Sequence, residues 1–286
     1  MPAWQPKVTT MLLPHLTDPE VLEQLLARAG TAPVHKLGQN FLVCDEPIEA
    51  IVSTLTDTVP LVTELGSGAG ALTQALLVNN YAVRAIEKDQ RLIELLKGHL
   101  PKKLRSNLTL VPGDLRDLSW EHDEPWQLVG NIPYNLSGLI IRRLTQLVHP
   151  PTQAILMVQQ EVGENMTAQA PQMTLLSVIM QLWGEAHLLL TIPADCYLPK
   201  PKVQSALVLL VPHEKQLPRA EREQIIGLAK RFFGHRRKQI GGIMKNQLHI
   251  EPDLIAATLA ETGLEGTARP QELTVEDWKS LAEKLP

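Results

Sequence analysis

The chain has only two cysteines, Cys44 and Cys196, among its 286 residues. Two cysteines are too few for the disulfide framework that stabilises small secreted domains. Neither has histidine or acidic neighbours at metal-ligand spacing, so we expect no zinc site and no other bound metal. Cys196 lies beside a proline-rich segment where a nucleophile is conceivable, but an isolated buried thiol is the better interpretation.

Long apolar runs and a positive net charge are also lacking. No stretch of about eighteen apolar residues occurs, so we expect no membrane-spanning helix and no membrane partner. The apolar run Met11–Leu13 is too short for a signal peptide, and the early Asp18 and Glu20 are unusual in a transit peptide, which favours a cytoplasmic protein. The net charge of -4 means that a nucleic-acid partner would need a local basic patch.

What the chain does have is 44% hydrophobic residues, enough for a packed core. Predicted strands alternate with helices, which is typical of a parallel sheet wrapped by helices. We expect an α/β fold with a doubly wound, seven-stranded sheet closed by an antiparallel pair. The predicted strands are 60–65, 81–86, 108–111, 127–129, 154–158, 187–192 and 205–211, and the predicted helices between and around them are 47–55, 71–77, 92–96, 139–147 and 173–183.

The two ends of the chain differ from this pattern. A helix over 19–29 forms an N-terminal extension, and after Pro212 only amphipathic helices are predicted, at 219–234, 236–247, 252–262 and 274–284. We therefore expect three parts: a helical extension over 1–35, an α/β domain over 36–212 and a small all-helical domain over 213–286. The helical domain begins with a concentration of Lys and Arg.

A glycine-rich loop, Gly66-Ser67-Gly68-Ala69-Gly70, follows the first predicted strand of the sheet. It lacks the Gly-Lys-Ser/Thr of a triphosphate-binding loop, and its glycine spacing departs from the dinucleotide fingerprint. Glu87 ends the next strand, 21 residues after Gly66, where a carboxylate can accept hydrogen bonds from ribose hydroxyls. Asp114 ends the third strand, where an acceptor can take an adenine amino hydrogen. Together these residues predict a site for a nucleoside-containing cofactor.

The fourth strand runs into Asn131-Ile132-Pro133-Tyr134. The Asn131 amide oxygen and the Ile132 carbonyl are two acceptors, and Tyr134 supplies an aromatic face beside them. This arrangement suits a planar ring with an exocyclic amino group, because the acceptors take both amino hydrogens while the ring stacks on the tyrosine.

These motifs occur in the order found in one family. The segments 39–42, 64–73, 131–135, 160–162 and 199–206 resemble the KsgA family of ribosomal RNA small-subunit adenine dimethyltransferases, which are Class I S-adenosylmethionine-dependent methyltransferases. The resemblance implies a Rossmann-like methyltransferase domain with a small C-terminal helical domain. It also implies transfer of methyl groups from S-adenosylmethionine to the N6 amino group of adenosines in small-subunit ribosomal RNA, with dimethylation of two adjacent adenosines during ribosome biogenesis. The partner is then ribosomal RNA within a small subunit or its precursor, and we expect the protein to act as a monomer.

The resemblance assigns roles to particular residues. The catalytic residues are Asn131, Pro133, Tyr134 and Tyr197, with the two tyrosines holding a flipped adenine between them. The cofactor-binding residues are Gln39, Asn40, Leu42, Gly66, Gly68, Glu87, Lys88, Asp114, Leu115 and Asn131. The RNA-binding residues are predicted from local positive charge and not from the resemblance: they are Lys230, Arg231, Arg236, Arg237 and Lys238 at the start of the helical domain, with Lys200 and Lys202 as further candidates. Tyr197 stands where the family usually has Phe, and its extra hydroxyl needs a hydrogen-bond partner.

Other functions fit parts of the pattern. The related macrolide-resistance enzymes methylate large-subunit RNA with similar motifs, although the helical tail and the segment 201–206 favour the small-subunit enzymes. A non-catalytic ribosome-assembly or transcription factor is a second alternative, and the intact Asn131, Tyr134 and glycine loop argue against it. A nicotinamide dehydrogenase is disfavoured by the glycine spacing.

Overall fold

The computed structural model of the chain describes residues 15–33 and 38–285. The chain divides into two compact units, each with a hydrophobic core. The first comprises Met1–Gly163 with His187–Val211, and the second comprises Glu164–Ala186 with Pro212–Pro286. The predicted boundary between the N-terminal extension and the α/β domain, at residues 35 and 36, lies outside the described residues.

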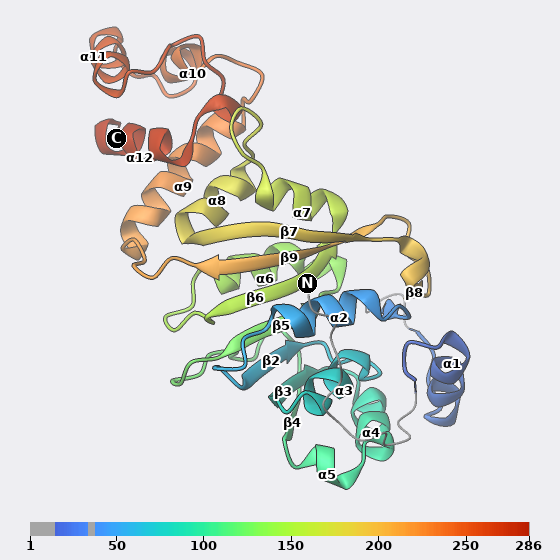
Figure 1. The fold of residues 1–286 in the computed structure, drawn as a ribbon. Coiled ribbons are helices and arrows are strands. Elements are labelled where there is room, and N and C mark those ends of the chain that lie inside the picture. Colours follow the sequence, from blue (N-terminus) through green and yellow to red (C-terminus); the bar gives the residue numbers. More distant parts are fainter. Residues whose placement is uncertain (1–14, 34–37, 286) are drawn as a thin grey trace. The chain divides into compact units, whose positions relative to one another are not determined.

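Figure 1 shows the strands and helices of the chain. The strands are β1 Phe41–Leu42, β2 Leu61–Leu65, β3 Ala82–Glu87, β4 Leu108–Pro112, β5 Gln127–Asn131, β6 Gln153–Gln159, β7 Gly184–Ile192, β8 Tyr197–Leu198 and β9 Ser205–Pro212. The helices up to the middle of the chain are α1 Pro19–Arg28, α2 Glu46–Thr54, α3 Ala71–Val78, α4 Gln90–His99, α5 Lys102–Arg105 and α6 Ser137–Leu144. The later helices are α7 Gln160–Thr167, α8 Leu175–Trp183, α9 Arg219–Phe233, α10 Ile240–Asn246, α11 Pro252–Thr262 and α12 Val275–Lys284.

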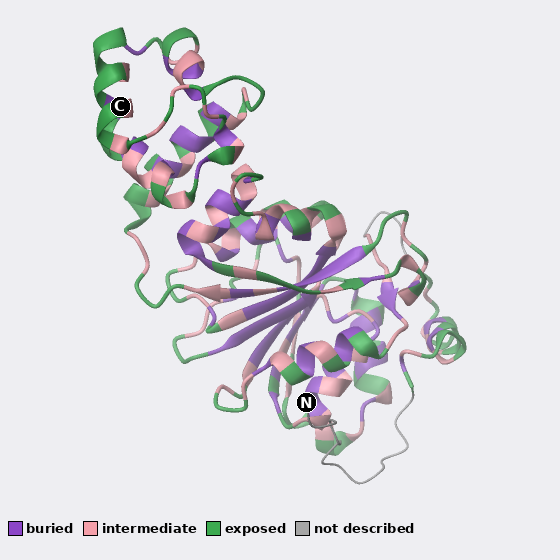
Figure 2. Cartoon of the chain, turned by 45° about the horizontal axis from the view of Figure 1, so that its top comes forward, coloured by how far each residue is buried: buried purple, intermediate pink, exposed green. Residues whose placement is uncertain are grey.

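The large sheet has seven strands in the order β4-β3-β2-β5-β6-β9-β7, and these are the seven strands predicted from the sequence. Neighbouring strands from β4 to β6 are parallel, whereas β9 runs antiparallel to β6. The predicted α/β sheet closed by an antiparallel pair is therefore confirmed. In β6, every residue from Ala154 to Val158 is buried, which requires cover on both faces of the sheet (Figure 2).

One face of this sheet packs against helices whose apolar residues follow the helical repeat. Ile48, Ile51 and Val52 of α2 share one core cluster with Leu72 and Leu76 of α3, and with buried residues of β2, β3, β5, β6 and β9. Because parallel strands end at the same edge of a sheet, the loops after β2, β3, β4 and β5 meet at their carboxyl ends. This is the edge at which the glycine loop, Glu87, Asp114 and Asn131 were predicted to converge.

A short two-stranded sheet was not predicted. Strand β1 pairs antiparallel with β8, in the register Phe41↔Leu198 and Leu42↔Tyr197. Two-residue strands carry no periodicity that a sequence pattern could reveal. The pairing places the segment before α2 beside the segment before β9, far away in the sequence.

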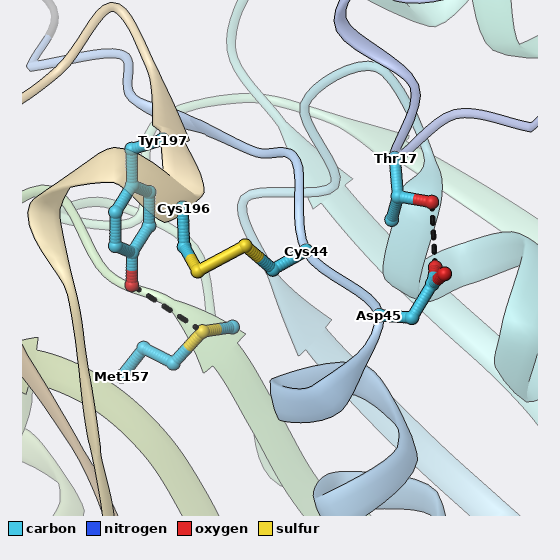
Figure 3. Close-up of a disulfide and its surroundings, with 6 residues drawn as sticks. All are labelled: Thr17, Cys44, Asp45, Met157, Cys196 and Tyr197. Atoms are coloured by element: carbon cyan, nitrogen blue, oxygen red, sulfur yellow. Dashed lines mark hydrogen bonds between the residues drawn. A yellow bond between two sulfur atoms is a disulfide. The ribbon is translucent and has the colours of Figure 1, made fainter.

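The interpretation of Cys196 as an isolated buried thiol is wrong. Cys44 and Cys196 form a disulfide, with their Cα atoms 5.1 Å apart and the two residues separated by 152 positions in the sequence (Figure 3). The β1–β8 pairing is the reason, because the Val43 N–H donates to the Cys196 carbonyl at 2.8 Å and so holds the two cysteines at the end of the paired strands. Both cysteines are only partly buried.

The second unit is helical and has its own core. Figure 1 labels its helices α8 to α12. Phe232 of α9 packs edge-on against Trp278 of α12, with the ring centroids 5.5 Å apart. Met173, Val178 and Leu182 belong to the same cluster, so the stretch 164–186, which lies within the predicted 36–212 domain, packs with the helical part of the chain. The sequence pattern does not distinguish this stretch from the rest of the α/β domain, because the residues of α8 have the apolar spacing of any helix in such a domain.

Among the described residues, no helix is long and apolar enough to cross a membrane.

Candidate active site

The glycine loop after β2 adopts a conformation that other residues rarely reach. Gly66, Gly68 and Gly70 have φ values of 78°, 56° and 97°, in the left-handed region. A Cβ atom on Gly70 would lie 2.2 Å from Leu96, and one on Gly68 would lie 3.3 Å from the Phe41 ring. Glycine is therefore required here both for backbone conformation and for space, and the loop leads directly into α3.

Glu87, at the end of β3, fixes this loop. Its Oε2 accepts a hydrogen bond from the Gly68 N–H at 2.9 Å, and its Oε1 accepts from the Lys88 and Asp89 N–H groups, also at 2.9 Å. Three of the roughly four acceptor positions of the carboxylate are thus used within the chain. The remaining position on Oε2 is available to a ribose hydroxyl. Burial is the main cause that raises the pKa of Glu87 above its ordinary value.

Asp114, at the end of β4, is held by two basic side chains. Arg116 binds both carboxylate oxygens, at 3.0 and 2.7 Å, and Lys88 Nζ lies 2.9 Å from Oδ2. The Arg116 guanidinium is the main cause that lowers the pKa of Asp114 well below its ordinary value. The Arg116 backbone N–H also donates to Oδ1, at 2.9 Å, so all four acceptor positions of this ionised carboxylate are used within the chain. An adenine amino group would have to replace one of these hydrogen bonds.

Two buried polar groups near the loop were not predicted as site residues. Glu64 of β2 is 1% exposed, and its Oε2 accepts a hydrogen bond from Thr73 Oγ1 at 2.6 Å. Desolvation is the main cause that raises the pKa of Glu64 to about 7, and the neighbouring charge of Glu87 raises it further. The Ser67 hydroxyl is buried and has no hydrogen-bond partner among the described residues. A glutamate inside an apolar strand was the signal that could have drawn attention to Glu64.

Asn131 ends β5 and is oriented by the segment after residue 37. Its Nδ2 donates to the Asn40 carbonyl at 2.8 Å, so the amide oxygen faces away from this bond and remains an acceptor. Gly38 has a φ of 67°, and a Cβ atom there would lie 3.2 Å from Asn135 and 3.3 Å from Pro133. This close packing joins the segment 38–42 to the segment 131–135. Gln39 in turn hydrogen-bonds to the Asp89 carboxylate.

The two tyrosines of the predicted adenine clamp lie in different environments. Tyr134 lines a cavity at the carboxyl ends of the parallel strands, and its hydroxyl is 2.7 Å from Ser205 Oγ. Tyr197 is 3% exposed, belongs to the hydrophobic core and does not line the pocket. Its hydroxyl donates to Met157 Sδ at 3.7 Å (Figure 3) and also hydrogen-bonds to Ser205. The extra hydroxyl of Tyr197 thus has partners, but a clamp with adenine between both rings is not formed in this conformation.

These groups surround one cavity of about 260 Å³ at the carboxyl ends of the parallel strands. All ten predicted cofactor-binding residues line it, together with Pro133 and Tyr134. Glu64, Met157 and two leucines of the N-terminal segment line it as well, and none of these was predicted. Glu87 and Glu64 are two acidic side chains beside the glycine loop. The hydrogen bond to Glu64 comes from a neutral hydroxyl, so its charge is not balanced by that partner. The two acidic groups therefore fit a cofactor that carries positive charge.

The chain matches the model of one protein family, ribosomal RNA adenine dimethylase, over residues 34–285. The chain belongs to this family. Its curated relatives include ribosomal RNA small subunit methyltransferase A of Treponema denticola, which is 32% identical over 94% of this chain and 95% of the relative. The protein of the same name from Dehalococcoides mccartyi is 31% identical over 86% of each chain. As a ribosomal RNA adenine dimethylase, the chain is an S-adenosylmethionine-dependent methyltransferase whose substrate is ribosomal RNA.

Solved structures support the same fold. A dimethyladenosine transferase from Plasmodium falciparum superimposes with a TM-score of 0.72 at 22% identity, over 84% of this chain and 95% of that one. The 23S rRNA methyltransferase ErmE superimposes with a TM-score of 0.67 at 26% identity, over 86% of this chain and 99% of that one. The predicted Rossmann-like methyltransferase fold is confirmed.

The residues of this adenine dimethylase that were predicted to bind RNA lie in both units. Lys200 and Lys202 are exposed in the loop between β8 and β9, where Lys200 pairs with Asp195. In the helical unit, Lys230 and Arg231 lie exposed in the last turn of α9, and Arg236, Arg237 and Lys238 are exposed as well. The predicted helix over 236–247 begins only at Ile240, because turn hydrogen bonds from His235 to Phe232 and from Lys238 to His235 occupy 232–238. The three consecutive basic residues therefore lie in a turn.

Proposed function

We propose that this methyltransferase modifies the N6 amino group of adenosines in small-subunit ribosomal RNA, within a small subunit or its precursor, and that it dimethylates two adjacent adenosines during ribosome biogenesis. The observation that carries the proposal is the orientation of Asn131. Its amide nitrogen is bound to the Asn40 carbonyl, which leaves its oxygen as an acceptor beside Tyr134, in the cavity that also contains the glycine loop and Glu87.

The adenine amino nitrogen is a poor nucleophile because its lone pair is delocalised into the ring. Hydrogen bonds from the amino group to the Asn131 oxygen and the Ile132 carbonyl favour the pyramidal geometry in which the lone pair is available, and they strengthen as the transition state forms. Pro133 fixes the turn that presents the Ile132 carbonyl. Tyr134 stacks on the extruded base, and its ring is held in place by the contact of its hydroxyl with Ser205.

When bound, S-adenosylmethionine supplies a methyl group that its sulfonium already activates, so the protein mainly has to align the amine. The residues that would contact the cofactor include Asn40, Leu42, Gly66 and Gly68. Gln39 orients the segment 38–42 through its hydrogen bond to Asp89. Glu87 would accept hydrogen bonds from the ribose and Asp114 from the adenine, and Lys88 and Leu115 line the cavity beside them.

We assign RNA docking to the exposed basic residues. In the helical unit, Arg236 and Arg237 line a surface pocket together with Phe233 and Arg269. Guanidinium groups beside an aromatic ring suit a phosphate and a base of structured RNA. Lys230, Arg231 and Lys238 extend this positive surface along the chain, and Lys200 and Lys202 supply positive charge in the β8–β9 loop.

We also propose a monomer that acts in the cytoplasm. Few large hydrophobic residues among those described are exposed, namely Val148, Leu188, Leu189, Val203 and Leu254, which favours a protein without an obligate partner copy. The cytoplasm is where ribosomal particles of bacteria such as those of the curated relatives are available as substrate. In that reducing compartment, Cys44 and Cys196 would be paired only under oxidation.

Mass analysis of small-subunit and large-subunit ribosomal RNA, from cells with and without this protein, tests the proposal. We expect loss of dimethyladenosine from the small-subunit RNA alone. Loss from the large-subunit RNA would instead assign the chain to the macrolide-resistance group, to which its similarity with ErmE points. An unchanged methylation pattern combined with a ribosome-assembly defect would favour a non-catalytic factor.

A further inference from the structure

The segment before residue 30 is a well-formed element. Helix α1 begins with Pro19 in its first turn, and the Asp18 carboxylate accepts a hydrogen bond from the Glu20 N–H at 2.8 Å. Thr17 Oγ1 donates to the Asp45 carboxylate at 2.6 Å, as Figure 3 shows. Asp45 directly precedes α2, so this hydrogen bond ties the start of the N-terminal segment to the methyltransferase fold.

The apolar face of α1 packs on the elements that carry the cofactor loop. Leu22 and Leu26 share one cluster with Phe41 of β1, Ala69 of the glycine loop, and Leu92 and Leu95 of α4. Phe41 is the ring that contacts Gly68. The helix thus lies against the same residues that shape the cavity.

Leu16 and Leu22 reach further than this cluster, because both line the cavity together with Gly68, Glu87 and Leu92. They are 3% and 1% exposed, so little of either side chain faces solvent. We propose that Leu16 and Leu22 are cofactor-binding residues, and that these two leucines form an apolar wall of the S-adenosylmethionine pocket. The inference rests on S-adenosylmethionine being the cofactor and is independent of which RNA is methylated.

The chemistry of the wall complements that of the acidic residues that line the same cavity. Glu64, Glu87 and Asp114 supply carboxylates for the charged and hydrogen-bonding groups of the cofactor, whereas two leucines offer only van der Waals contact and exclusion of water. Excluding water strengthens the electrostatic interactions of the neighbouring carboxylates with a cationic ligand. The wall should therefore increase affinity for the cofactor without contributing to recognition of the RNA.

Titration calorimetry of the full chain with S-adenosylmethionine and with S-adenosylhomocysteine tests this inference. Leu22→Ala should weaken the binding of both ligands about tenfold, which corresponds to about 1.4 kcal/mol. This is less than the free energy gained by fully burying a leucine side chain. Leu16→Ala should have an effect of similar size. In contrast, Leu26→Ala should bind both ligands with the parent's affinity.

Leu26 is the matched control because it is 3% exposed, lies on the same helix and belongs to the same cluster, but does not line the cavity. Equal weakening by Leu22→Ala and Leu26→Ala would overturn the inference, since it would indicate a general effect of loosening α1. Parent affinity in both Leu16→Ala and Leu22→Ala would overturn it as well. If Leu22→Ala does not fold, Leu16→Ala and the conservative Leu22→Met decide, and Leu22→Met should retain most of the affinity.

Failure of this inference can be told apart from failure of the proposed function. A parent protein that binds S-adenosylmethionine tightly but leaves small-subunit RNA unmethylated would contradict the proposed substrate, yet the leucine variants would still test the wall. Normal methylation together with parent affinity in the leucine variants would contradict the wall alone.

Discussion

Replacing Glu64 by Gln should stabilise the cofactor-free protein above neutral pH. Burial raises the pKa of Glu64 from 4.5 to about 7, which means that the folded chain disfavours the ionised carboxylate. A raised pKa contributes stability that is fully present below pH 4.5 and is lost as the pH rises through 7. At about 1.36 kcal/mol per pKa unit, the parent loses about 3 kcal/mol of unfolding free energy through this group by pH 8. Gln cannot ionise and still accepts the hydrogen bond from Thr73.

Urea unfolding of the parent and Glu64→Gln between pH 5 and 8 measures this effect. The difference in unfolding free energy should change by about 2–3 kcal/mol in favour of Gln across this range. The exposed Glu49→Gln, with the same change in formal charge, serves as the control. Thr73→Val removes the hydrogen bond that lowers the pKa of Glu64, so the loss of stability with rising pH should continue to values above 7 in this variant. A difference between parent and Glu64→Gln that stays constant from pH 5 to 8 would refute the reasoning.

Binding of the cofactor gives an independent measurement of the same group. A ligand that carries positive charge favours the ionised carboxylate and lowers its pKa. Near pH 7, binding of S-adenosylmethionine to the parent should therefore release protons, which calorimetry in buffers of different ionisation enthalpy detects. Glu64→Gln should release fewer protons at the same pH.

Three further changes test other parts of the structure. Asn131→Ala should lower turnover by about 10²–10³, by analogy with the loss of one preorganised hydrogen-bonding group, while the RNA remains bound. A rate near the parent's in a single-turnover assay would rule out the role of Asn131 as acceptor for the adenine amino group. Under oxidising conditions Cys44→Ser should lower the unfolding free energy by about 2–5 kcal/mol, because the disulfide closes a long loop, and the difference should disappear when both proteins are reduced. Joint replacement of Arg236, Arg237 and Lys238 by Ala should weaken RNA binding and leave cofactor affinity unchanged. The slope of log affinity against log salt should fall by roughly 0.7–0.9 for each phosphate that the variant no longer neutralises. A slope equal to the parent's would indicate that the lysines of the β8–β9 loop bind the RNA instead.

The sequence predicted the parts of the fold that repeat a pattern. All seven strands of the large sheet, and the convergence of the glycine loop, Glu87, Asp114 and Asn131 at one edge, follow from alternation of elements and from the rule that parallel strands end together. The residues in this set are close in sequence to strand ends, which periodicity locates well.

Features that depend on tertiary contact were missed. The Cys44–Cys196 pair needs the β1–β8 pairing, which joins segments 152 residues apart through strands of two residues each. The hydroxyl of the buried Tyr197 bonds to Met157, which is 40 positions away in the sequence. The basic turn at 236–238 was expected to be helical, because charge and apolar spacing there resemble a helix while the backbone turns instead.

The disulfide also changes the connectivity of the polypeptide. When it is formed, residues 45–195 lie within a covalent ring that contains strands β2 to β7. The two tails of this ring are the segment before Cys44 and the segment after Cys196, which includes β8, β9 and the C-terminal helices. A protease that cuts once within the ring leaves both products attached, so the nicked chain migrates as one species until a reductant is added. A cut in either tail releases a fragment at once. Limited proteolysis on paired reducing and non-reducing gels therefore reads out the oxidation state of the two cysteines directly from the pattern of fragments.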